Sequence, residues 1–473
     1  MLNIPEYESA KKVFHFFEEI SKIPHTSEHT EKIADYLVDF AKARNLWFSK
    51  DEYNNVIIRK NATPGYEDRP AIILQGHTDM VADKLPDADI DMLCDGLQIY
   101  RDGDFIKAQG TTLGADDGIA VAYALAILDS DDIEHPEFEA VFTSDEEIGL
   151  IGAGKLDTSL LHGNRMLNID SDVEGVFTVG CAGGIRLDLS TPYEPTESSS
   201  SLCRLTITGF RGGHSGVEID KGRENAIKAL AEILSEAEGV RIASISGGNA
   251  DNAIPRFAEC IISCGQKDSL TEKIIPKVME KYYKTESDAS VNITDISENL
   301  PCFSESDSKK IIELITKMPT GVYKMSEDIE GLVETSSNLG IISTDGGRVK
   351  LSVSVRSSKN AEKLSMIERI KDIGRGYGVS VSGRGEYPAW EYRKDSPLTD
   401  TVAKIYRETY SREPKIEIIH AGLECGIFAD KIKGLDCVSL GPLMYDIHTT
   451  DERLSISSTV RVWEFLKKVL KEI

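Results

Sequence analysis

The feature that most constrains this chain is a series of short apolar runs, each followed at once by acidic or histidine side chains. Such runs are typical of buried strands, and helical patterns lie between them, so the alternation predicts an α/β fold. Sheets of this class place functional side chains just beyond the carboxyl ends of their strands. We therefore expect distant groups to converge at one edge of a sheet. These groups are Gln75–Asp79, Gly114–Gly118, Ser144–Glu147, Asn168–Asp170 and Asp446–His448.

Composition excludes several classes of protein. The chain has 473 residues, too many for one ordinary core, with 54 Lys and Arg against 79 Asp and Glu, a net charge of −25. Such a surface repels nucleic acid and anionic membranes, and no apolar run approaches the ~18 residues of a membrane span. The N-terminus is charged where a signal peptide is apolar. Eight dispersed cysteines without C-x-x-C spacing then predict reduced thiols and a cytoplasmic location.

The order of the patterns predicts two domains, one of them discontinuous. The strand–helix alternation runs to about residue 190, where a stretch rich in Pro, Glu and Ser (192–201) is typical of a linker. Two segments of similar strand–helix–strand pattern follow, and the α/β pattern resumes after Tyr392. We predict a catalytic domain of residues 1–190 and 393–473 with a central mixed sheet. Residues 191–392 would form an inserted α+β lid made of two related halves.

Two of the candidate ligands are ambiguous when taken singly. His77 and Asp79 form an H-x-D pair after a strand, so the imidazole could hold a metal while the carboxylate holds the other ring nitrogen's proton. Alone, that pair is a weak signal. Asp116 follows Gly114 at the start of a helix, where it could bridge two cations but where an aspartate is also a common helix cap.

The remaining candidates also have ordinary explanations. Glu146 and Glu147 are adjacent, so one could bind a metal while the other faces a water, or both could be the solvated end of a strand. Asp170 is either a terminal ligand or a turn residue, and His448 lies in a loop after an apolar strand. Taken together, the three carboxylates, two imidazoles and one further glutamate suffice for two zinc ions and a general base. Their joint occurrence favours a hydrolase site.

This ordered set resembles the dinuclear zinc metallopeptidases related to aminoacylase, carnosinase and carboxypeptidase G, and within them the bacterial aminoacyl-histidine dipeptidases. The resemblance covers nearly the whole chain. Further strings that carry it are Gln109–Gly118, Gly180–Gly184, Phe210–Gly216 and His420–Gly426.

The resemblance implies a role for each candidate. One zinc would be held by His77, Asp116 and Asp170, and the other by Asp116, Glu147 and His448, with Glu146 as the general base and Asp79 orienting His77. In the lid, His214, Arg356 and Asn252 match substrate-binding positions, and Glu424 could meet a free amine.

The resemblance also implies how many chains build the site. In dimeric relatives the lid imidazole comes from the other subunit. Here His214 lies in the first half of the lid and Arg356 in the second. We therefore expect the doubled lid to complete the active site within one chain. A homodimer is compatible with this arrangement.

The implied function is hydrolysis of unblocked dipeptides, Xaa-His and β-alanyl-histidine among them, with no nucleic-acid or membrane partner. Zinc is expected as the metal, although imidazole and carboxylate ligands also accept Co²⁺ and Mn²⁺. Three alternatives remain: an N-acyl-amino-acid amidohydrolase, a tripeptidase, and a non-catalytic protein that binds metal or peptide.

Overall fold

The computed structural model describes the chain except residues 1–3, 5–6, 198–200, 264 and 266, and it separates into two compact units. Unit 1 comprises Met1–Cys181, Tyr392–Ile418 and Leu423–Ile473, and unit 2 comprises Ala182–Glu391 and Ile419–Gly422. The chain thus enters unit 2 earlier than the boundary expected at residue 190. The reason is that Gly183–Pro192 forms a full strand in the sheet of unit 2.

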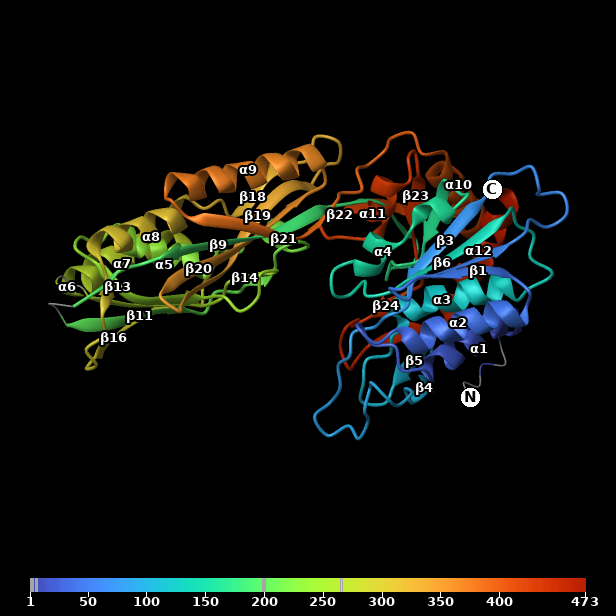
Figure 1. The fold of residues 1–473 in the computed structure, drawn as a ribbon, viewed down its shortest axis with the longest axis horizontal. Coiled ribbons are helices and arrows are strands. Elements are labelled where there is room, and N and C mark those ends of the chain that lie inside the picture. Colours follow the sequence, from blue (N-terminus) through green and yellow to red (C-terminus); the bar gives the residue numbers. More distant parts are fainter. Residues whose placement is uncertain (1–3, 5–6, 198–200, 264, 266) are drawn as a thin grey trace. The chain divides into compact units, whose positions relative to one another are not determined.

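The core of unit 1 is an eight-stranded sheet that is mixed, as the sequence predicted (Figure 1). Its four central strands, β6, β3, β7 and β23, run parallel, while β1, β2 and β8 pair antiparallel. In spatial order the strands are β1 (Trp47–Lys50), β2 (Val56–Lys60), β6 (Phe138–Thr143), β3 (Ile72–His77), β7 (Arg165–Asn168), β23 (Asp436–Ser439), β8 (Val176–Cys181) and β22 (Lys415–Ile419).

Helices pack against this sheet. Helix α3 is apolar on every side and nearly all of it is buried, with contacts to β3, which is the behaviour expected of an internal helix. Figure 1 shows α1, α2 and α3 grouped together. The helices of unit 1 are η1 (Glu8–Ala10), α1 (Lys11–Ser21), α2 (Glu31–Ala43), α3 (Ala115–Leu128), α4 (Ile151–Lys155), η2 (Thr158–Leu160), α10 (Pro397–Tyr410), α11 (Glu424–Lys431) and α12 (Ile456–Glu472).

A second, small antiparallel sheet in unit 1 joins segments from both ends of the chain. Strand β25 pairs on one side with β24 and on the other with β5. The loop between β24 and β25 is thereby fixed close to residues from the first quarter of the sequence. The strands are β4 (Ile99–Asp102), β5 (Phe105–Ala108), β24 (Met444–Tyr445) and β25 (Arg453–Ser455).

Unit 2 is built on a nine-stranded antiparallel sheet that falls into two four-stranded groups. The groups meet between β13 and β19, which are joined through a single residue pair, Gly247 and Ile342. Strand β18 also pairs with β19. The first group is β16 (Ser290–Ile296), β11 (Leu202–Thr208), β15 (Ala258–Ser263) and β13 (Arg241–Gly247); the second is β19 (Val333–Asp345), β20 (Arg348–Ser357), β9 (Gly183–Pro192) and β21 (Ser380–Tyr387), with β18 (Gly321–Met325) beside it.

Helices and short strands complete unit 2. Apolar residues of its longer helices pack with those of the sheet in one core. The stretch expected to be a linker instead holds the end of β9 and the short strand β10, apart from residues 198–200, which lie outside the description. These elements are β10 (Pro195–Thr196), β12 (Gly213–His214), η3 (Ile219–Lys221), α5 (Ala226–Ser235), β14 (Ala253–Ile254), α6 (Lys267–Ser269), η4 (Leu270–Ile274), α7 (Ile275–Tyr282), β17 (Cys302–Phe303), α8 (Glu305–Lys317) and α9 (Asn360–Gly376).

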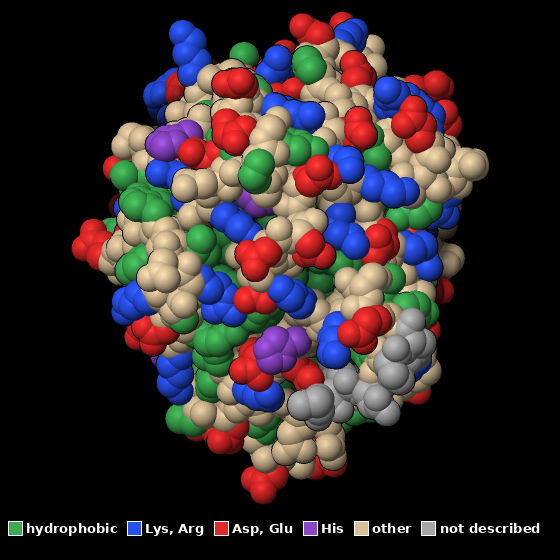
Figure 2. Space-filling view, turned by 90° about the vertical axis from the view of Figure 1, so that its right-hand side faces the viewer, with side chains coloured by type: hydrophobic (Ala, Val, Ile, Leu, Met, Phe, Trp, Pro, Cys, Tyr) green, Lys and Arg blue, Asp and Glu red, His purple; other side chains and the backbone are tan. Residues whose placement is uncertain are grey.

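Two further observations bear on the expectations from composition. Among the described residues, no helix combines the length and the apolar character needed to cross a bilayer. None of the seven described cysteines forms a disulfide bond, and Cys264 lies outside the description. Figure 2 shows acidic and basic side chains interspersed over the face that it presents.

Candidate metal centre

The carboxyl ends of neighbouring parallel strands bring the candidate ligands of unit 1 together. His77 is the last residue of β3, while the 146–147 pair and Asp170 follow β6 and β7. The ligand atoms form three groups, each with its atoms within 4.8 Å of one another. These groups are His77, Asp116 and Asp170; Asp116, Glu147 and His448; and His77, Glu146 and Glu147.

Asp116 is the residue that two of these groups share. Its Oδ1 lies 3.1 Å from Nε2 of His77, and its Oδ2 lies 3.1 Å from Nε2 of His448. The same His448 nitrogen is 2.9 Å from Oε1 of Glu147. Burial opposes ionisation of Asp116, yet hydrogen bonds with the two imidazoles outweigh it and lower the pKa of the carboxyl. One carboxylate therefore faces two separate ligand sets.

The ring of His77 is oriented by the backbone rather than chiefly by a carboxylate. Its Nδ1 lies 2.9 Å from the carbonyl oxygen of Asp79 and 3.5 Å from Oδ1 of that residue. Because a carbonyl only accepts, Nδ1 carries a proton, and the hydrogen bond from Nε2 to Asp116 requires a second proton on the ring, which a cation held by Nε2 would replace. The sequence predicted that Asp79 orients His77; the nearer contact is its main chain.

The carboxylate of Asp79 holds the turn that carries the two glutamates. It accepts hydrogen bonds from Oγ of Ser27 at 2.7 Å, from the backbone N–H of Glu146 at 2.9 Å and from that of Glu147 at 3.2 Å. The side chain is almost completely buried, so these bonds are shielded from water. Asp79 thereby fixes the backbone of the candidate base and of a candidate ligand at once.

The cluster contains more acidic side chains than positively charged side chains that could pair with them. Burial raises the pKa of Glu146 and of Asp170 well above the usual range. Oδ2 of Asp170 and Oδ1 of Asp117 are buried without a hydrogen-bond partner. Hydrogen bonds with Asp116 and Glu147 raise the pKa of His448 to about 10. Carboxylates that lack partners in a buried cluster of this kind fit the donor set of divalent cations.

The neighbouring Asp117 has a different place from Asp116. It is fully buried, and its Oδ2 accepts the backbone N–H of His77 at 3.2 Å. A Cβ at Gly76 would lie 2.4 Å from that oxygen, so this position of β3 requires glycine. Asp116 therefore belongs to the ligand cluster, whereas Asp117 supports the strand that carries His77.

Glu424, expected to meet a substrate amine, is enclosed within unit 1. Its Oε2 accepts hydrogen bonds from Nε2 of Gln75 at 2.5 Å and from Oγ1 of Thr143 at 2.6 Å, while Oε1 has no hydrogen-bond partner. Asn168 extends this network to Gln75 with a bond of 2.7 Å. Burial raises the pKa of Glu424 to about 7. The side chain is therefore part of a buried polar network at the ends of β3, β6 and β7.

The other three candidates lie in unit 2. Nδ1 of His214 accepts the backbone N–H groups of Gly216 and Val217, both at 3.2 Å, so the ring's proton is on Nε2. Arg356 lies on β20 and donates to the hydroxyl of Tyr387 at 3.1 Å. Asn252 and Arg356 line one small cavity together with Tyr387. Burial and the nearby Arg356 charge lower the pKa of His214.

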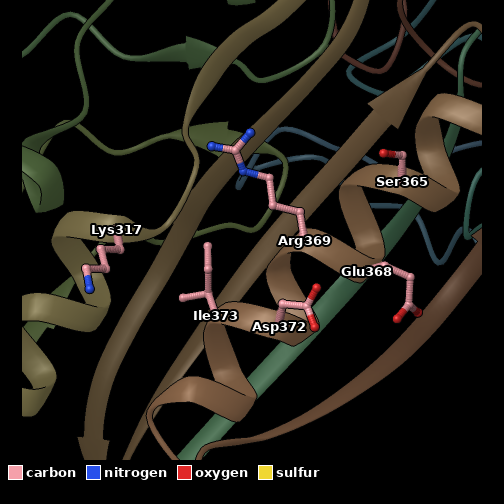
Figure 3. Close-up of a pocket in the computed structure, with 6 residues that line it drawn as sticks. All are labelled: Lys317, Ser365, Glu368, Arg369, Asp372 and Ile373. Carbon is pink, nitrogen blue, oxygen red and sulfur yellow. The ribbon is translucent and has the colours of Figure 1, made fainter.

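A larger hollow in unit 2 contains none of the candidate residues. It measures about 620 Å³ and lies along α9, where Figure 3 shows side chains at its rim. Four of its six lining side chains are charged, and it is open to solvent. Its chemistry therefore does not suggest a catalytic site. The lining residues are Lys317, Ser365, Glu368, Arg369, Asp372 and Ile373.

One residue that supports the cluster was not found from the sequence. Glu452 is buried and accepts hydrogen bonds from the backbone of Leu113, Gly114, Ala115 and Asp116. Its sequence position, in a polar stretch just after His448, gave no periodic or motif signal.

Comparison with known proteins identifies the family of this chain. Residues 73–472 match the Peptidase family M20/M25/M40. The chain is 34% identical over 475 residues to the cytosol non-specific dipeptidase of Escherichia coli (strain K12), with 98% of each covered. The crystal structure of aminoacylhistidine dipeptidase from Vibrio alginolyticus matches with a TM-score of 0.90 and 33% identity over 99% of both chains. A Staphylococcus aureus tripeptidase, at TM-score 0.57 and 18% identity over 98% of this chain and 99% of its own, shares the fold. The chain therefore belongs to peptidase family M20/M25/M40, as its sequence predicted, and is a peptide-bond hydrolase.

Proposed function

We propose that this protein is a dinuclear metallo-dipeptidase that hydrolyses unblocked dipeptides, including those with C-terminal histidine. The observation that carries the proposal is the pair of ligand groups that share Asp116. The names of the E. coli and Vibrio relatives, each matched over nearly its full length, support dipeptides as the substrate class. The E. coli relative is named for the cytosol, and we propose the same location here.

The ligand types favour zinc, with Co²⁺ and Mn²⁺ as chemically acceptable replacements. His77 and Asp170 would complete one site with Asp116, and Glu147 and His448 would complete the other. Bound cations of this kind supply Lewis acidity, which lowers the pKa of a water and polarises a carbonyl.

Glu146 would carry the protons of the reaction. It takes a proton from the attacking water, whose oxygen forms a bond to the peptide carbonyl carbon, and it delivers that proton to the amine nitrogen as the C–N bond breaks. Burial raises the pKa of this carboxyl, which strengthens it as a base, and Asp79 holds its backbone. Both properties suit a residue that must accept and then release a proton at one place.

The residues of unit 2 would bind the substrate. His214 carries its proton on Nε2, the form that can donate to a carbonyl oxygen that gains negative charge. The planar guanidinium of Arg356, with Asn252 in the same cavity, suits a terminal carboxylate. In unit 1, the buried Glu424 keeps one oxygen without a partner, and that atom would receive a substrate ammonium.

We also propose that one chain supplies the complete active site. His214 lies in the short strand β12 and Arg356 lies in β20, and both strands belong to unit 2 of the same chain. An obligate monomer should then be active. If activity is lost on dilution and returns on mixing His214→Ala with Arg356→Ala subunits, the site is instead shared between chains.

Zinc-reconstituted protein assayed on a matched panel tests the function. The panel contains free dipeptides, β-alanyl-histidine, their N-acetylated forms and tripeptides. We expect turnover of the free dipeptides alone. Preference for the acetylated forms would indicate an N-acyl-amino-acid amidohydrolase, and preference for longer peptides a tripeptidase. Stoichiometric metal without turnover of any peptide would indicate a non-catalytic binder.

A further inference from the structure

The start of helix α3 is closed by a side chain from the far end of the sequence. Oε2 of Glu452 accepts the backbone N–H groups of Leu113 at 2.7 Å and Gly114 at 3.0 Å. Oε1 accepts those of Ala115 at 2.8 Å and Asp116 at 3.4 Å. Glu452 is only 3% exposed, so both oxygens are committed to this backbone.

The helix itself cannot provide this closure. The first N–H groups of a helix have no partners within it and are usually met by a capping side chain. Here the cap position is Gly114, whose φ of 68° lies in the left-handed region and which has no side chain to accept. Without Glu452, these four buried N–H groups would therefore stay unpaired, directly beside the Asp116 side chain.

The same loop attaches to Asp116 twice. Between β24 and β25 it carries both His448, whose Nε2 contacts Oδ2 of Asp116, and Glu452, which holds the Asp116 backbone. His448 has a φ of 64°, a conformation that residues other than glycine rarely adopt and that persists only where the surroundings hold it. The backbone N–H of Glu452 donates to Thr449 at 3.1 Å, which closes the loop.

We propose that Glu452 is a positioning residue of the metal centre, which fixes the Asp116 carboxylate so that one oxygen faces His77 and the other faces His448. The inference rests on the proposed two-cation site. A residue that holds the shared ligand acts on both cations together, whereas a residue that only stabilises the fold need not change the affinity of either site. This distinction separates the proposal from a general stabilising role.

A carboxylate is required for geometric as well as electrostatic reasons. Four backbone N–H donors point at this side chain, and a negatively charged acceptor forms stronger hydrogen bonds with them than a neutral one. Both oxygens accept two N–H groups, so a glutamine would turn its own N–H₂ toward two donors and leave them unpaired. Glu452→Gln therefore changes few atoms but removes half of the closure.

A buried carboxylate in unit 2 offers a matched control. Glu286 is fully buried and accepts the backbone N–H groups of Arg211 at 2.8 Å and Glu224 at 2.9 Å. Unit 2 contains none of the candidate metal ligands. Glu286→Gln thus repeats the chemical change at a buried carboxylate without touching the metal centre.

The experiment measures Zn²⁺ binding to metal-free protein by competition with a chromogenic chelator. We expect Glu452→Gln to weaken both zinc sites by about 10- to 100-fold, Glu452→Asp to weaken them less, and Glu286→Gln to bind as the wild type does. In the metal-free state, hydrogen exchange at the amides of residues 113–116 should be faster in Glu452→Gln. If this variant does not fold, zinc affinity and hydrogen exchange are measured on Glu452→Asp instead.

Two results would overturn the inference. One is wild-type affinity at both zinc sites in folded Glu452→Gln, and the other is an equal loss in Glu286→Gln. A wild-type protein that binds fewer than two zinc ions would contradict the proposed metal site itself, and so the two failures can be told apart.

Discussion

Replacing Asp79 by asparagine tests how the turn that carries Glu146 and Glu147 is held, without changing any candidate metal ligand. The carboxylate accepts the backbone N–H of Glu146 through Oδ1 and that of Glu147 through Oδ2. Asparagine has one acceptor oxygen. Whichever way its amide turns, the N–H₂ group faces one of these donors, and a buried N–H is left unpaired.

The expected loss of stability follows from the number of hydrogen bonds that the substitution removes. Loss of one hydrogen bond to a charged acceptor, with a buried donor left unpaired, costs about 2–4 kcal/mol of unfolding free energy. Because the turn carries the candidate base and a candidate ligand, kcat and zinc affinity should each fall by about 10- to 100-fold. The contact of His77 with the Asp79 carbonyl oxygen is unaffected by this substitution, so the His77 ring should stay in place.

Ser27→Ala is the control for this variant. It removes one of the three donors to Asp79 and leaves both backbone bonds, so we expect a cost of only about 0.5–1.5 kcal/mol and nearly normal kcat. Urea unfolding of the metal-free proteins and steady-state kinetics of the zinc-loaded ones provide the measurements. Wild-type kcat and zinc affinity in Asp79→Asn would refute this account of the turn.

Three further predictions concern the base, the packing of the centre and the response to acid. Glu146→Ala should retain two zinc ions while kcat falls by about 10²–10⁴-fold; metal content and kinetics check this. Gly76→Ala places a Cβ 2.4 Å from Asp117 and should cost at least about 1–3 kcal/mol, whereas Gly154→Ala meets no atom within 4 Å and should be nearly neutral in urea unfolding. Burial lowers the pKa of His420 to about 3. The unfolded chain therefore binds more protons between pH 6.5 and 3, and acid unfolds the protein more readily. His420→Gln should recover about 2 kcal/mol at pH 5; equal acid sensitivity in both proteins would contradict this.

The sequence predicted the parts of the centre that have a local signal. His77, Glu147 and Asp170 each stand where an apolar strand ends, and parallel strands end at one edge, so their convergence could be inferred. The parallel centre of the sheet follows from the same alternation. These features depend on neighbours within a few residues, which is the range over which hydrophobic periodicity carries information.

The supports of the centre depend on contacts that no local pattern encodes. Glu452 contacts Leu113 across 339 positions, and Glu424 contacts Gln75 across 349. A buried acceptor for four N–H groups could be anticipated only once Gly114 is known to cap the helix without a side chain. Likewise, Gly183–Pro192 has the alternating pattern of any half-buried strand, and only its pairing with β20 and β21 places it in unit 2.

The central claim is that two divalent cations share the carboxylate of Asp116. Anomalous diffraction at the zinc edge from crystals grown with zinc measures this directly. We expect two peaks about 3.5–4 Å apart, one beside His77 and Asp170 and the other beside Glu147 and His448. A single peak, or zinc bound elsewhere while these side chains hold none, would contradict the account.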